Sequence, residues 1–167
     1  MLLAESLQTQ PLTHQELVAV ALGFARAQDG WRHQIQYDEN DRYTFLLHAD
    51  DDVDIWLCTW LAGQRTSLHD HGGSAGAIAV VTGQLTESRL ARGGRIGRRR
   101  IRAGRSSLVT PNVVHDVRND KQRPAVSIHA YSPPLTRMSF YDREGIASVS
   151  RLRTVDLMAA ASWEAHA

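Results

Sequence analysis

Most of the chain beyond residue 42 consists of short runs of β-branched and aromatic residues separated by Gly, Pro, Asn or Asp. Each run has the length of a β-strand, and the residues between the runs favour turns. About eight strands at this spacing are typical of an all-β sandwich or barrel. The expected strands are residues 43–48, 53–60, 77–81, 84–90, 95–102, 106–109, 113–117 and 125–131.

A helix is expected before the strands, over residues 13–28. Thr13 can cap its first turn while the Glu16 side chain reaches back to the Thr13 backbone N–H, which is the capping-box arrangement. Apolar residues then recur at helical spacing from Leu17 onwards, and Gly30 can supply the left-handed residue that ends a helix. We expect the apolar face of this helix to pack on the outside of the β-structure.

The length of 167 residues fits one domain with one core. We therefore expect a single domain over residues 1–167, with the helical segment at about 13–28 and a β-barrel at about 43–142. Beyond the barrel, residues 147–155 can form a last strand and residues 157–163 a short helix.

Charge and cysteine content exclude several classes of protein. The 19 basic and 18 acidic residues give a net charge of +1, so the chain as a whole does not attract nucleic acid or an anionic membrane. Cys58 is the single cysteine, and its apolar neighbours predict a small buried hydrophobe rather than a reactive thiol. No apolar run reaches the ~20 residues of a membrane span, and no secretion signal is recognisable. We expect a cytoplasmic protein with no nucleic-acid or membrane partner.

Eight arginines lie between residues 89 and 105. They could form a patch for a polyanion, or they could occupy the outward positions of a solvated hairpin. The hairpin is favoured because Gly93 and Gly94 mark its turn, and because no aromatic residues interleave the arginines to stack on bases. The arginines are Arg89, Arg92, Arg95, Arg98, Arg99, Arg100, Arg102 and Arg105.

His69 and His71 stand two residues apart in a strand-like segment, so both imidazoles are expected on the same face. A barrel built from hairpins can place a third histidine, His115, beside them. Three imidazoles at one point are typical of a transition-metal site. A His-x-His pair also occurs by chance, so the residues around it decide the interpretation.

Glycines frame this pair in a known pattern. Gly63, His69, His71, Gly76 and Gly83 resemble the first sequence motif of the cupins. Gly76 replaces a glutamate that cupins usually carry in that motif.

A second stretch matches the second cupin motif. Gly104, Pro111, His115 and Asn119 resemble it with one residue of slippage, and Val113 replaces its inner glycine. The resemblance implies an all-β cupin fold, a double-stranded β-helix or jelly-roll barrel, with the N-terminal helix packed outside. It also implies that the three histidines bind one metal ion.

Three neutral imidazoles leave coordination positions open on an octahedral metal, and they leave Fe(II) with its full positive charge. Such a site should attract an anionic ligand such as a thiolate and still have room for O₂. Non-haem iron oxygenases more commonly use two histidines and one carboxylate. The ligand count alone also fits zinc, nickel or copper.

Ser127, His129 and Tyr131 alternate along the last expected strand, so all three are expected on one face. Alone they could be a polar stripe that satisfies its own hydrogen bonds in a core. Together with residues 60–71 and 114–119, however, the Ser-x-His-x-Tyr-Ser-Pro-Pro run from Ser127 resembles the cysteine dioxygenase family of cupins, in particular its bacterial branch.

This resemblance covers residues 43–142 and implies a reaction. In the family, Ser127 would fix His129, and His129 would fix the Tyr131 phenol beside the iron. The implied cofactor is Fe(II), with O₂ as co-substrate, and a small thiol, cysteine or a relative, becomes a sulfinic acid: RSH + O₂ → RSO₂H. Tyr131 is expected to be unmodified, because Gly76 stands where mammalian members carry a cross-linking cysteine. Enzymes of this type are often monomers, which is the expectation here.

Phe45 follows Tyr43 and Thr44 and stands where many members carry an arginine that pairs with the substrate carboxylate, whereas an ungapped count back from His69 places Tyr43 there. Arg42 is expected to face the opposite way, because a one-residue slip reverses a side chain's direction. Arg65 and Arg118 are then candidates for that pairing. The substrate could also be 3-mercaptopropionate, another thiol acid, or a bulkier thiol.

Two other functions compete with the dioxygenase. The first is a non-enzymatic metal-binding cupin that senses a small ligand, although the relay would serve little purpose in a pure binder. The second is a carbohydrate isomerase or epimerase, although residues 77–80 offer no polar groups for a sugar.

Overall fold

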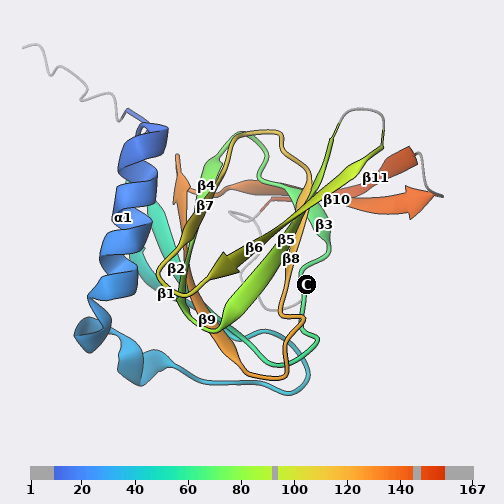
Figure 1. Ribbon diagram of the computed structural model, residues 1–167. Helices are drawn as coiled ribbons and strands as arrows, with labels where there is room; N and C mark the ends of the chain where they lie inside the picture. The colour runs from blue at the N-terminus through green and yellow to red at the C-terminus, as the bar shows by residue number, and fades with distance from the viewer. Residues whose placement is uncertain (1–9, 92–93, 145–147, 157–167) are drawn as a thin grey trace, which may run out of the picture.

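Two antiparallel sheets built from short strands face each other, and a helix lies against the outside of one of them (Figure 1). The computed structural model describes residues 10–91, 94–144 and 148–156. The strands are β1 (Thr44–Ala49), β2 (Asp54–Trp60), β3 (Leu68–Asp70), β4 (Ala75–Thr82), β5 (Gln84–Leu90), β6 (Ile96–Arg102), β7 (Ser106–Val109), β8 (His115–Arg118), β9 (Ala125–Ser132), β10 (Arg137–Glu144) and β11 (Ser148–Asp156).

The order of strands brings distant parts of the chain together. The five-stranded sheet has the order β1-β2-β9-β4-β7, and the six-stranded sheet has the order β11-β10-β3-β8-β5-β6. Strand β3 therefore lies between β10 and β8, while β9 occupies the middle of the opposite sheet. The histidine-bearing strands β3 and β8 are neighbours, and the barrel interior separates them from β9.

All eight predicted strands are present, with small shifts at their ends. Strand β11 also matches the last strand predicted over residues 147–155. Strand β10 was not predicted, because the polar and charged residues of the segment leave only a short apolar signal in Met138 and Phe140, which are both buried. The short helix predicted at residues 157–163 lies outside the described residues.

Helix α1 (His14–Arg26) begins with the predicted capping box. The backbone N–H of Glu16 donates to the Thr13 hydroxyl over 3.3 Å, and the backbone N–H of Thr13 donates to the Glu16 carboxylate over 2.8 Å. Two N–H groups that the first turn cannot pair are thus satisfied. In the described part of the chain, no helix is long and apolar enough to cross a membrane.

The helix packs against β4 and β9 through the small, fully apolar face formed by Leu17, Ala21 and Ala25. It ends at Arg26, before the predicted end at residue 28. Gly30 belongs to a following 3₁₀ turn, η1 (Gln28–Gly30), and does not end α1. A second such turn, η2 (Arg32–Gln34), leads the chain back towards the sheet.

Alternation along β2 divides the apolar residues between two layers. Ile55 and Leu57 face the helix, whereas Cys58 and Trp60 face the barrel interior. Cys58 is 4% exposed, and burial raises the pKa of its thiol to about 12. The prediction of an inert, buried cysteine is therefore confirmed.

Strands β5 and β6 pair as the predicted hairpin, and Arg98, Arg99 and Arg100 on β6 are exposed. The Arg89 side chain does not point outwards as expected. Its guanidinium turns inward to the buried Glu87 carboxylate, with Nε 2.9 Å from Oε1. The interpretation of all eight arginines as solvated was thus wrong for Arg89.

Replacing Thr13 with Ala should lower the free energy of unfolding by about 1 kcal/mol, because the first turn loses its side-chain acceptor. Urea denaturation followed by circular dichroism measures the change. Thr13→Ser keeps the hydroxyl and serves as the control, which should retain most of the stability. Equal stability of the Ala and wild-type proteins would contradict a stabilising role for the cap.

Candidate metal centre

Three histidines converge inside the barrel. His69 on β3 pairs directly with His115 at the start of β8, and His71 follows β3 on the same face as His69. One ligand nitrogen from each lies within 4.8 Å of the others, and the Nε2 atoms of His71 and His115 are 3.2 Å apart. The structure thus brings together the three residues predicted as metal ligands.

All three imidazoles are buried, and burial affects the protonation of two of them, His69 and His71. All three are at most 4% exposed. Burial, followed by the proximity of His115, lowers the pKa of His69 and of His71 well below the usual range. A neutral imidazole presents a lone pair, and three histidine nitrogens that converge in a buried space suit a divalent transition metal. The residues present therefore fit a metal ion.

The outer nitrogens of the three rings meet different partners. Nδ1 of His69 lies 2.7 Å from the Ser67 carbonyl oxygen, and Nδ1 of His115 lies 3.0 Å from Oε1 of Glu87. Nδ1 of His71 is buried and has no hydrogen-bond partner among the described residues. In each case the Nε2 atom remains for the metal.

Glu87 was not identified from the sequence, although the alternation of β5 contained a signal for it. Leu85 and Glu87 occupy inward positions of the same strand, and Glu87 is fully buried. Burial alone would raise the pKa of Glu87, but hydrogen bonds from His115, Arg89 and Ser107 outweigh it and lower the pKa to about 2. A buried carboxylate therefore stands directly behind one metal-binding ring.

The three relay residues lie in line along β9, as predicted. The Ser127 hydroxyl is 3.0 Å from Nε2 of His129, and Nδ1 of His129 is 3.4 Å from the Tyr131 hydroxyl. Trp60 extends the line, since its indole N–H donates to the Ser127 hydroxyl over 2.9 Å. Trp60 was not assigned to the relay from the sequence.

Burial, aided by the charge of Arg42, lowers the pKa of His129 to about 3. Burial, with smaller effects from Cys58 and Asp54, raises the pKa of Tyr131 above its usual value. His129 is therefore neutral and the phenol is protonated at physiological pH. If Ser127 donates to His129 and His129 donates to the phenolic oxygen, the Tyr131 hydroxyl hydrogen is left for the metal side.

Tyr131 packs edge-on against His71, with the ring centroids 4.8 Å apart. Gly76 lies beside both rings: a Cβ atom there would be 3.1 Å from the His71 ring and 3.2 Å from Cε1 of Tyr131. A glycine thus allows this close approach and provides no side chain that could bond to the tyrosine.

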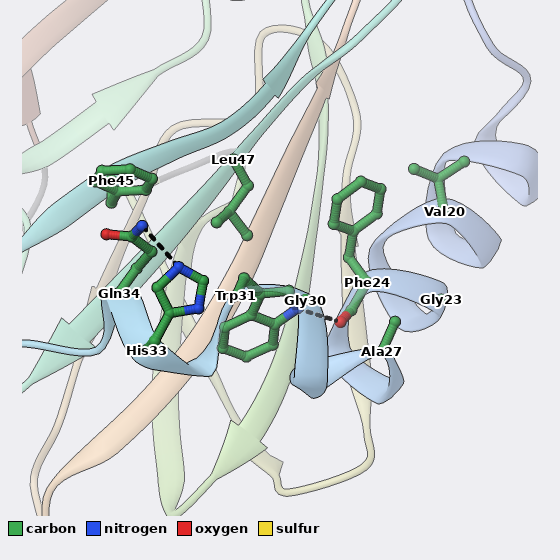
Figure 2. Close-up of a pocket in the computed structure, with 10 residues that line it drawn as sticks. All are labelled: Val20, Gly23, Phe24, Ala27, Gly30, Trp31, His33, Gln34, Phe45 and Leu47. Atoms are coloured by element: carbon green, nitrogen blue, oxygen red, sulfur yellow. Dashed lines mark hydrogen bonds between the residues drawn. The ribbon is translucent and has the colours of Figure 1, made fainter.

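Phe45 does not line the metal site. Its side chain lies on the outer face of β1, in an apolar cavity of about 680 Å³ between that strand and α1 (Figure 2). Leu47 and Trp31 line the same cavity. Phe45 therefore does not fill the space that a carboxylate-binding arginine would occupy.

Arg42 faces the barrel interior, contrary to the sequence-based prediction. It precedes β1 by two residues and shares a face with Thr44, which pairs with the inward Cys58. Its guanidinium carbon lies 4.8 Å from the centre of the Trp60 ring. The prediction assumed that Phe45 faces inward, and the observed register reverses that assumption.

The other two arginine candidates lie away from the metal site. Arg65 is exposed, and its backbone pairs with that of Arg118. Arg118 lines a groove on the outer face of the six-stranded sheet, together with Thr86 and three arginines of β6. Neither side chain shares the barrel interior with His115.

Solved structures share this fold. A protein from Thermus thermophilus has a TM-score of 0.56 at 17% identity, over 62% of this chain and 93% of that chain. A Klebsiella pneumoniae protein with a double-stranded β-helix domain has a TM-score of 0.53 at 13% identity, over 87% of this chain and 99% of that chain. A cupin superfamily protein from Desulfitobacterium hafniense has a TM-score of 0.52 at 14% identity, over 62% of this chain and 87% of that chain. The predicted cupin barrel with an external N-terminal helix is therefore confirmed.

The sequence as a whole matches one family. Residues 1–144 match the family described as cysteine dioxygenase type I, and this match includes the three histidines, the relay and both sheets up to β10. Together with the three-histidine cluster, it makes the protein a metal-dependent enzyme of the cupin fold. The chain belongs to the cysteine dioxygenase type I family.

Proposed function

We propose that this protein is a non-haem Fe(II) thiol dioxygenase that converts a small thiol acid, cysteine or a close relative, into a sulfinic acid: RSH + O₂ → RSO₂H. The observation that carries the proposal is the buried line of Ser127, His129 and Tyr131 ending against His71. A site that only stored or sensed a ligand would gain little from a chain of hydrogen bonds leading to a protonated phenol.

His69, His71 and His115 would hold the iron, which is the metal that the family uses. When bound, Fe(II) supplies the redox chemistry that joins O₂ to a thiolate. The protein's own contribution is to hold the three rings in fixed directions and to surround them with buried side chains. Burial excludes bulk water, which strengthens the attraction between the cation and an anionic sulfur.

Tyr131 would orient the reacting groups. Its phenol cannot easily ionise, since burial raises its pKa, so it remains a hydrogen-bond donor. His129 and Ser127 fix the direction of that donor from behind. A donor held at a fixed point in a buried site stabilises charge on sulfur or oxygen without reorganising during the reaction.

Arg42 would pair with the substrate's carboxylate. Its Nε atom is buried without a hydrogen-bond partner among the described residues, and its guanidinium stacks on Trp60 at the start of the relay. A buried N–H without a partner is costly and is satisfied when an acceptor arrives. A carboxylate would provide two oxygen acceptors in the planar geometry that arginine matches.

The first prediction concerns the metal. Wild-type protein loaded anaerobically with Fe(II) should retain about one iron per chain, and His69→Ala or His115→Ala should reduce it to background, because each removes a buried ligand. Elemental analysis after desalting measures the iron. His48→Ala, which changes a surface histidine paired with Asp50, is the control. Background iron in the loaded wild-type protein would refute the site.

The second prediction concerns the substrate. Oxygen uptake should be seen with cysteine or 3-mercaptopropionate, and Arg42→Met should lower kcat/KM for these acids by roughly 10–100-fold, because a charge-assisted hydrogen bond is lost. Cysteamine, which lacks a carboxylate, should be used equally poorly by both proteins. Arg98→Met changes an exposed arginine and controls for charge.

The same screen can reject the proposal. If no thiol, including larger ones, causes oxygen uptake by iron-loaded protein, the dioxygenase is rejected and a metal-binding cupin that senses a small ligand is favoured. If a bulky thiol without a carboxylate is the best substrate, the assignment of Arg42 is wrong while the dioxygenase remains.

The third prediction concerns the relay. Tyr131→Phe should slow turnover roughly 100-fold, because it removes a fixed donor but keeps the packing of the ring against His71. Iron content should remain at the wild-type value. If Tyr131→Phe lost iron as well as activity, the role of Tyr131 would be to bind the metal or hold its ligands, and not to act on the substrate.

A further inference from the structure

We propose that Glu87 is a positioning residue of the metal centre, whose carboxylate acts through His115 and restores part of the negative charge that the three-histidine ligand set lacks. The resemblance to the cupin motif places a glutamate at the position of Gly76. Here the carboxylate belongs to Glu87, and the His115 ring lies between it and the metal position. This inference rests on the proposed metal site and is independent of the reaction that the site performs.

The contact between Glu87 and His115 fixes the ring. Nδ1 of His115 lies 3.0 Å from Oε1 of Glu87, and both side chains are nearly or fully buried. A carboxylate can only accept, so Nδ1 carries a hydrogen towards Glu87, and Nε2 is the nitrogen that faces the other histidines. Such a partner orients a metal-binding histidine and raises its basicity.

His115 is the member of the triad with this kind of partner. His69 donates to a neutral backbone carbonyl of Ser67, and Nδ1 of His71 has no partner among the described residues. The three histidines are therefore not equivalent, and His115 would be the most basic ligand to a bound metal ion.

The carboxylate itself is clamped from behind. Arg89 donates two hydrogen bonds to Glu87, from Nε to Oε1 over 2.9 Å and from Nη2 to Oε2 over 3.1 Å. The Ser107 hydroxyl also donates to Oε2 of Glu87, over 2.5 Å. With His115, four donors therefore hold the two oxygens. Glu87 is charged and rigid, as a carboxylate must be to fix a ring to within a few tenths of an ångström.

Arg89 also moderates the charge of Glu87. The Arg89 side chain is 30% exposed, so water screens part of its charge, whereas the Glu87 side chain is fully buried and is not screened in this way. The negative charge is therefore felt more strongly inside the barrel than the positive one. Removing the carboxylate should weaken the binding of a divalent cation.

A purely structural role for Glu87 predicts a different result. In that role, the ion pair between Glu87 and Arg89 stabilises strand β5 and has no effect on His115. In that case, removing both charged partners together should restore whatever the single change disturbs. In the positioning role, the paired removal restores stability but not metal binding, because the acceptor that faces Nδ1 of His115 no longer carries a negative charge.

The test uses Co(II), whose d–d absorption reports the geometry of its ligands, added to metal-free full-length protein in competition with a chelator. Glu87→Gln should raise the Kd for Co(II) about 10–100-fold and alter the absorption bands. The double variant Glu87→Gln with Arg89→Met should show the same weak binding, although its Tm recovers towards that of the wild type. Ser88→Ala, a neighbouring buried position on the opposite face of β5, should match the wild type.

Wild-type affinity and spectrum in Glu87→Gln would overturn the inference. If Co(II) affinity and Tm both recovered in the double variant, the inference would be overturned as well. The ion pair of Glu87 with Arg89 would then have a structural role only. Oxygen consumption plays no part in these measurements. Tight Co(II) binding that depends on Glu87, in a protein that oxidises no thiol, would therefore reject the proposed reaction and support the inference.

Discussion

The pairing of β3 with β8 holds the candidate site together, since it sets His69 directly opposite His115. The contact joins two segments that are far apart in the sequence, and it exists only because the six-stranded sheet places β3 between β10 and β8. His71 then reaches the same point by the alternation of side chains along an extended chain. Three imidazoles that would be costly to bury separately thus share one position inside the barrel, where a cation can satisfy all of their lone pairs.

The two sheets supply opposite walls of this interior with different chemistry. The six-stranded sheet contributes the histidines and the buried Glu87, while β9 of the five-stranded sheet contributes the hydrogen-bonded line that ends at Tyr131. The walls meet where Tyr131 packs edge-on against His71. Gly76 permits that contact, because any Cβ atom there would press on both rings. The glycine therefore offers no side chain to the histidine cluster and makes room for the phenol.

Local patterns in the sequence were sufficient for the features that depend on periodicity. The strands, the capping box at Thr13, and the shared faces of His69 with His71 and of Ser127 with Tyr131 all follow from the spacing of residues along one segment. Features that depend on register between segments were missed or misplaced. The inward direction of Arg42 is set by the pairing of Thr44 with Cys58, and the role of Glu87 is set by the pairing of β5 with β8. Neither pairing can be read from one segment alone, and a shift of one residue reverses every side chain.

The two arginines that turn towards the interior show how charge is distributed in this barrel. Arg89 is already matched, because Glu87 accepts hydrogen bonds from its Nε and Nη2 atoms. Arg42 stacks on Trp60, and its Nε is buried without an acceptor among the described residues. The charge of Arg42 is felt at the histidine cluster, because it contributes to lowering the pKa of His69, and a bound cation would add a second positive charge. The proposed substrate, a small thiol acid, would supply two anionic groups on one molecule, and its thiolate and carboxylate would offset the charges of the metal and of Arg42.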